Sequence, residues 1–398
     1  MPGIPGAAFA KRRGLFAAQR HYREIALFFI RRIVFILLYP ALAVPLPAQG
    51  PGNDLERLSS FADPARLWGG GVEAVIEEAY RMAFKTYIIG GKVMNLRMPF
   101  AENDERNKLS SQDWQFLGGG KANPGYLWGV IDGILKTGDF SRYVEALGDG
   151  KEKVIVFDIP SKTWRPSRDL YDLARMKAGA YHGLPHRPMV WVSGKGIGEQ
   201  DVYNYLYCAG WVGMDCSGFV WHVLSHVART GGIDLNRRIG SALGTPRNMD
   251  TSLYMGTWFF NSSSREILPV SGEINQLRPG DILLFRSADG TIAHSAVIQS
   301  IDFTAGLIRY LQSTDEAPPI ERGVHESFIH FDPLHPETPL RDPSLIWTQF
   351  RYPPFPGERA SPFSDDGKRY RAYPELGGGR VVRLRALEEI LRTLNRKR

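Results

Sequence analysis

Cys216 is the side chain of this sequence best placed for covalent chemistry. It stands in the segment Asp215-Cys216-Ser217-Gly218, and the apolar positions 219, 220, 223, 224 and 227 that follow share one helical face. A helix of about four turns is therefore predicted to begin at or just before Cys216. The partial positive charge and the N–H groups of a helix N-terminus favour a thiolate and can hold an oxyanion.

His294 is the residue that could act as the base for such a thiol. It lies in the apolar segment 292–298, which follows the turn Asp289-Gly290 and is predicted to form a strand, where a side chain is held rigidly. An imidazole base also needs an acceptor that fixes its tautomer. Gln312 is the candidate acceptor, because a hairpin would lay its strand beside that of His294.

Three blocks of the chain, taken in order, resemble a known family. They read Asp-Cys-Ser-Gly-Phe-Val at 215–220, Leu-Arg-Pro-Gly-Asp-Ile-Leu-Leu-Phe at 277–285 and Ala-His-Ser-Ala-Val-Ile at 293–298. Together they resemble the signature blocks of NlpC/P60 cysteine peptidases. The resemblance implies a papain-like α+β core in which Cys216 is the nucleophile, His294 the base and Gln312 the orienting group.

The same resemblance implies a substrate class and further site residues. It implies hydrolysis of amide bonds in peptidoglycan stem peptides, and we expect neither a cofactor nor a metal. Tyr207 is the counterpart of a family tyrosine that precedes the nucleophile, and with Asp215 and Ser217 it is assigned to substrate binding. The family more often has His where this chain has Gln312, although a Gln amide oxygen accepts an imidazole N–H equally well.

Several alternatives stay open at this point. The same fold could carry an acyltransferase or amidase acting on lipids or small amides, or a non-catalytic module that binds the cell wall. A disulfide between Cys208 and Cys216 would block the nucleophile. His222 and His226 have the spacing of a zinc pair, but no third ligand accompanies them, and a solvated helix face is the expected setting for both.

The elements that would position these residues form an α+β arrangement. A helix followed by an antiparallel meander of strands at 282–285, 292–298 and 307–312 predicts this class. Residues 50–165 are predicted to form an N-terminal α/β region of unknown role, with two helices within 54–85 and a buried strand at 153–157. Residues 166–398 are predicted to form the catalytic domain with insertions: a helix at 170–180, extended segments at 189–192 and 203–207, a surface loop at 353–379, a strand at 380–384 and a basic terminal helix.

The N-terminal segment has the composition of an export signal. Basic residues precede the apolar run 33–44, which small residues and prolines follow up to residue 48. This order predicts a secretory signal peptide at 1–48 or, as the alternative, an N-terminal membrane anchor. The anchor would enclose Arg31 and Arg32, each at a cost of about 2.5–3.5 kcal/mol. We therefore expect an exported protein of the periplasm or cell envelope, with membrane contact through this segment only.

The net charge of +7 favours anionic partners by long-range attraction. Nucleic acid is not expected among them, because the sequence has no cluster of basic and aromatic residues and no finger spacing. Peptidoglycan stem peptides are the partner that the three blocks imply.

Overall fold

The computed structural model describes the part of the chain from residue 71 onward, with gaps. The described residues are 71–101, 122–147, 152–158, 163–166, 189–193, 197–206, 212–243, 251, 255–314, 323–349 and 366–396. The chain divides into two compact units, residues 1–50 and 51–398, and every described residue belongs to the second. The predicted leader at 1–48, the first helix within 54–85, the helix at 170–180, Tyr207 and Cys208 lie outside the described residues.

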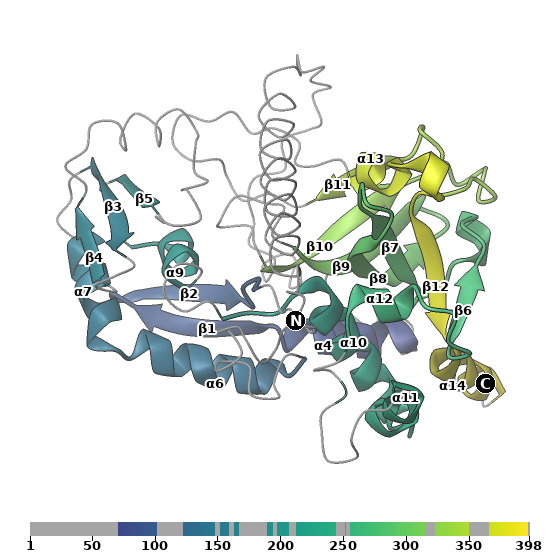
Figure 1. Cartoon of the computed structure of the whole chain (residues 1–398), viewed down its shortest axis with the longest axis horizontal. Helices are drawn as coiled ribbons and strands as arrows, with labels where there is room; N and C mark the ends of the chain where they lie inside the picture. Colours follow the sequence, from purple (N-terminus) through teal and green to yellow (C-terminus); the bar gives the residue numbers. More distant parts are fainter. Residues whose placement is uncertain are drawn as a thin grey trace, which may run out of the picture. The chain divides into compact units, whose positions relative to one another are not determined.

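Seven of the described strands form one antiparallel sheet in the order β11-β10-β9-β8-β7-β12-β6, shown in Figure 1. Their bounds are Ile267–Val270 for β6, Ile282–Arg286 for β7, Ile292–Asp302 for β8, Leu307–Thr314 for β9, Gly323–His330 for β10, Ile346–Gln349 for β11 and Arg380–Leu384 for β12. β7 to β11 form a meander in which each strand pairs with the next in the chain. This arrangement confirms the predicted strands and the α+β class.

Helix α10 (Cys216–Thr230) packs against one face of this sheet at β8 and β9, and against helix α4 (Val72–Arg81). Its predicted apolar positions, Phe219, Val220, Val223, Leu224 and Val227, are all buried. The helix thus has the start, length and buried face that the sequence predicts. Further helices are α11 (Leu235–Leu243), α12 (Thr257–Phe260), α13 (Asp366–Arg371) and the basic terminal helix α14 (Arg385–Arg396). Among the described residues, no helix is both long and apolar enough to cross a membrane.

The polar face of α10 was predicted to be solvated, and for His222 this is wrong. Its imidazole is buried against α4, with Nε2 at 2.9 Å from the carbonyl oxygen of Ala79. That oxygen lies in the last turn of α4, where helix carbonyls need partners from elsewhere. His226, one turn further on, is partly exposed and lies 3.3 Å from the carboxylate of Glu78. The two histidines therefore join α10 to α4.

The region before residue 166 contains both helices and strands. Its strands β1 (Phe84–Ile89) and β2 (Lys92–Arg97) form a hairpin, its helices include α6 (Pro124–Leu135) and α7 (Gly138–Leu147), and a separate sheet contains β3 (Glu152–Asp158), β4 (Thr163–Pro166) and β5 (Met189–Ser193). The strand expected at 153–157 is confirmed as β3. Because α4 shares a core with α10, part of this region supports the predicted catalytic domain directly. The boundary near residue 165 stays a prediction.

The extended segment predicted at 203–207 is wrong where the structure describes it. Residues 199–205 form helix α9 (Glu199–Tyr205), which begins where Asp201 accepts a hydrogen bond from Gly198 N at 2.8 Å. The hydroxyls of two tyrosines in this helix hydrogen-bond to different neighbouring elements. Tyr203 accepts from Arg97 N at 2.7 Å, and Tyr205 donates to Asp139 at 2.8 Å.

The surface loop predicted at 353–379 is also wrong in its described part. Residues 366–371 form α13, and residues 374–376 form the short 3-10 helix η5 (Pro374–Leu376). Asp366 and Tyr370 are four residues apart, share one helical face and are both buried. The ring of Tyr370 stacks on that of Trp347 in β11, with 5.3 Å between centroids. This packing onto the sheet explains why residues 366–371 form a helix although most of them are charged.

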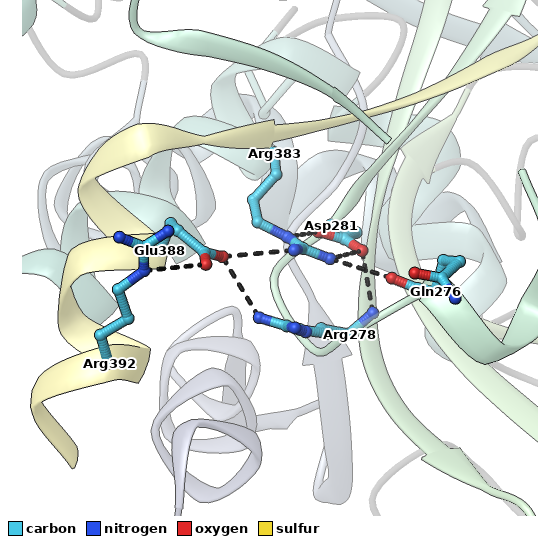
Figure 2. A network of polar contacts seen from close by, with 6 residues as sticks. All are labelled: Gln276, Arg278, Asp281, Arg383, Glu388 and Arg392. Carbon is cyan, nitrogen blue, oxygen red and sulfur yellow. Dashed lines mark hydrogen bonds and ion pairs between the residues drawn. The ribbon is translucent and has the colours of Figure 1, made fainter. Parts of the chain in front are cut away.

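A polar network surrounds the start of the interior strand β7, as Figure 2 shows. The guanidinium of Arg383 in β12 donates to both carboxylate oxygens of Asp281, at 2.5 and 2.7 Å. Asp281 also accepts from the backbone N–H of Arg278 at 2.8 Å. Glu388 of α14 accepts from Arg383, Arg278 and Arg392 at 3.2–3.3 Å. The block Leu-Arg-Pro-Gly-Asp therefore provides an anchor between β7, β12 and α14.

Candidate active site

Asp215 starts the helix that carries Cys216. Its backbone is extended, and its carboxylate accepts a hydrogen bond from Gly218 N at 2.5 Å while its carbonyl oxygen accepts from Phe219 N at 3.0 Å. An N-cap aspartate of this kind satisfies amide groups that the helix leaves without partners. Cys216 occupies the first helical position with a partly exposed side chain. Cys208, its partner in the disulfide alternative, lies outside the described residues.

Ser217 and Asp215, predicted to bind substrate, are both buried. The hydroxyl of Ser217 donates to the Asp215 carboxylate at 3.0 Å and lies 3.4 Å from the carbonyl oxygen of Met255. These contacts fix the first turn of α10. A role for the two residues in substrate binding stays a prediction.

Two bridges hold the start of α10 against the strands that carry His294 and Gln312. The first runs to β9, where the hydroxyl of Ser313 donates to Met214 O at 2.6 Å. The second runs through the segment before α12, because Met255 O contacts Ser217 and the hydroxyl of Thr257 donates to Ile292 O at 2.7 Å. Ser313 is next to Gln312 in the chain, and Ile292 is two residues before His294. These hydrogen bonds link the first turn of α10 to the two strands that carry the predicted partners.

His294 and Gln312 meet as the hairpin predicts. Nε2 of His294 lies 2.7 Å from Oε1 of Gln312, across the neighbouring strands β8 and β9. An amide oxygen has no proton to donate, so the imidazole must donate from Nε2. In the neutral ring Nδ1 is then the acceptor, which is the atom able to take a proton from a thiol.

The setting of His294 keeps its imidazole neutral. The side chain is buried, and its ring lies 5.2 Å from that of Phe285. Burial lowers the pKa of His294 well below its usual value of 6.5. The positive charge of Arg369 and the nearby His325 lower this pKa further, while the hydrogen bond to Gln312 opposes them. A neutral ring near pH 7 is the form that a general base requires.

The amide of Gln312 is held by residues that the sequence analysis did not identify. Its Nε2 donates to Ser327 Oγ at 2.8 Å and to Asp366 Oδ2 at 2.9 Å, and Tyr310 donates to the same Asp366 oxygen at 2.7 Å. Ser327 and Tyr310 are cross-strand partners in β10 and β9, so strand pairing was the signal that could have found them. Asp366 comes from α13, and no motif marks it.

The described residues contain no group of three or more His, Cys, Asp or Glu side chains arranged to hold a metal ion. His222 and His226 have the spacing of a zinc pair, but Nε2 of His222 is hydrogen-bonded to the carbonyl oxygen of Ala79. Burial lowers the pKa of His222 to about 4, so its ring is neutral near pH 7 as well. The His222–His226 pair thus has a packing role in this structure.

Comparison of the chain with protein-family models, with curated proteins and with solved structures found no match.

Proposed function

We propose that this protein is an exported cysteine hydrolase that cleaves amide bonds in peptidoglycan stem peptides through a thioester on Cys216. The observation that carries the proposal is the hydrogen bond from His294 Nε2 to Gln312 Oε1, in the sheet against which the helix that begins at Cys216 packs. It leaves Nδ1 as the basic atom of a buried neutral ring. A thiol at a helix start and a base with a fixed tautomer are the two parts of a thiol nucleophile system.

The reaction begins with proton transfer from the thiol of Cys216 to Nδ1 of His294. The sulfur attacks the amide carbon, and the carbonyl oxygen becomes an oxyanion. The proposal assigns the oxyanion to backbone N–H groups in the first turn of α10, where the positive end of the helix favours negative charge. The C–N bond then breaks, and the proton on Nδ1 passes to the leaving amine.

Water completes the cycle by attacking the thioester. His294 takes a proton from that water, hydroxide adds to the acyl carbon, and the C–S bond breaks to release a carboxylic acid. The proton returns to the sulfur. The net change is one amide plus one water to one acid plus one amine, and the chain's own side chains supply each transfer.

The substrate assignment rests on the resemblance of the three sequence blocks to NlpC/P60 peptidases, and a papain-like form of the α+β fold is part of the same proposal. Export rests on the basic and apolar composition of residues 1–48, and the positive net charge suits an anionic wall polymer. The proposed location is therefore the periplasm or cell envelope, where peptidoglycan is found.

The test is the release of new amino groups from purified peptidoglycan by the native chain, by Cys216→Ala and by the matched control Cys208→Ala. We expect Cys216→Ala to reduce release to background and Cys208→Ala to retain it. Circular dichroism checks that both variants are folded. Release by folded Cys216→Ala at the native rate would reject the thiol mechanism. Mass analysis of the products identifies the bond that is cleaved.

A further inference from the structure

The direction of the Gln312 amide decides which nitrogen of His294 carries the proton. With Oε1 toward the ring, His294 donates from Nε2 and keeps Nδ1 basic. With the amide turned over, its NH₂ group would face the ring, Nε2 would have to accept, and the proton would sit on Nδ1. That second state cannot take a proton from Cys216. Something must therefore hold the amide in the first orientation.

Two oxygen atoms contact Nε2 of Gln312, and only one can select the orientation. The hydroxyl of Ser327 can donate or accept, so it would serve either end of the amide. The carboxylate oxygen of Asp366, 2.9 Å away, accepts hydrogen bonds and cannot donate them. Turning the amide would bring two acceptor oxygens together at this distance in a buried setting.

We propose that Asp366 is a positioning residue that fixes the Gln312 amide and, through it, the Nε2–H tautomer of His294. A chain of hydrogen bonds then runs from α13 to β9 and β8, from Asp366 through Gln312 to His294. The carboxylate is itself held, because the hydroxyl of Tyr310 donates to the same Oδ2 at 2.7 Å and Asp366 is buried. Arg369, one turn along α13, lowers the pKa of His294 as well.

The first test reads the tautomer directly in the native chain. Histidines are labelled with nitrogen-15, and the His294 signals are assigned by their loss in His294→Gln. The proposal predicts a proton on Nε2 and an unprotonated Nδ1 at pH 7. A proton on Nδ1 would overturn it. This measurement needs no substrate, so its result does not depend on the proposed function.

The second test compares Asp366→Leu with Asp366→Asn, each checked for folding by circular dichroism. Asparagine can still present an oxygen to Gln312, so we expect it to keep the native tautomer. Leucine removes the acceptor, and we expect signals of the Nδ1–H tautomer to appear. A folded Asp366→Leu with the native tautomer would refute the positioning role.

A kinetic arm rests on the proposed function. We expect kcat of Asp366→Leu to fall about tenfold or more while KM stays within about twofold, with Asp366→Asn close to the native enzyme. An equal loss in both variants would show a role of the negative charge in place of the acceptor, and would overturn the proposal. If Cys216→Ala proves active, the kinetic arm is lost with the proposed function, and the tautomer measurements still decide the role of Asp366.

Discussion

The sheet contains two buried polar assemblies. One is a closed pair of opposite charges, and the other is a chain of hydrogen bonds that ends on an imidazole. The assembly around Asp281 pairs a carboxylate with the guanidinium of Arg383 through two hydrogen bonds, so each charge has its opposite within it (Figure 2). The assembly of Asp366, Gln312 and His294 runs in one direction, from a carboxylate through an amide to an imidazole. Its last member keeps a basic ring nitrogen. Under the proposed function, the first assembly contributes to stability and the second to proton transfer.

The largest expected effect is a loss of activity when the second assembly is changed at His294. His294→Gln removes the basic nitrogen at the end of the second assembly, and under the proposed function we expect kcat/KM to fall about 10³-fold, or about 4 kcal/mol. The urea midpoint should change little, because an amide can still hydrogen-bond to Gln312. Rate assays and urea unfolding check both parts. If His294→Gln lowers the stability strongly while its folded fraction stays active, the second assembly would have a structural role and the comparison would be wrong.

The first assembly should respond in the opposite way. Asp281→Asn leaves the guanidinium of Arg383 without its buried counter-charge, and we expect a loss of about 3 kcal/mol in the free energy of unfolding. Activity per folded molecule should be retained. Glu388→Gln is the matched control in the same network, and because Glu388 is more exposed we expect a loss below about 1 kcal/mol. Urea unfolding of both variants measures the difference, and equal losses would contradict it.

His222 makes the stability of the α4–α10 contact depend on pH. Its pKa is about 4 in the folded chain, against 6.5 when exposed, so the unfolded state binds more protons between these values. The contribution is fully present above pH 6.5 and is lost as pH falls toward 4. We expect the native chain to lose about 3 kcal/mol more over this range than His222→Gln, which can still donate to Ala79 O. Urea unfolding at pH 7.5 and 4 tests this, and parallel curves would contradict it.

The smallest expected effect is the change in kcat/KM as the pH falls from 7 to 5.5. An imidazole with a pKa of 6.5 would be about one-tenth neutral at pH 5.5, which would lower kcat/KM about tenfold. His294 has its pKa lowered by burial, so the neutral base persists as pH falls through 6.5 and is lost only below it. We expect kcat/KM at pH 5.5 to stay within about twofold of its value at pH 7. A tenfold fall with the fold intact would show that His294 titrates normally.

Local signals explain the parts of the molecule that the sequence predicted well. The start of α10 was predictable because Asp215 is an N-cap followed by an amphipathic run. Both signals lie within one short stretch of the sequence. The contact between His294 and Gln312 was predictable because a hairpin brings neighbouring strands together. Each inference required only a helix period or a strand pairing.

The residues that were misjudged depend on contacts between distant segments. From its own helix alone, His222 is expected to be exposed. Its hydrogen-bond partner, the carbonyl oxygen of Ala79, comes from α4, far away in the sequence. Tyr203 and Tyr205 alternate as in a strand, yet their partners on β2 and α7 favour a helix. Asp366 follows Gln312 by 54 positions, and its place beside Gln312 depends on α13 packing on the sheet. Patterns within a short window carry no information about such pairs.

The order of the strands has a consequence for how the molecule is assembled during synthesis. The meander from β7 to β10 pairs neighbours in the chain, so it can form from local contacts, whereas β12 inserts between β6 and β7 from 102 positions beyond Asp281. Cys216, His294 and Gln312 are all made before α13 and β12. A nascent chain thus holds its thiol and its imidazole for some time before Asp366 and the closing strand exist, and it reaches its finished geometry only when the last segment is in place.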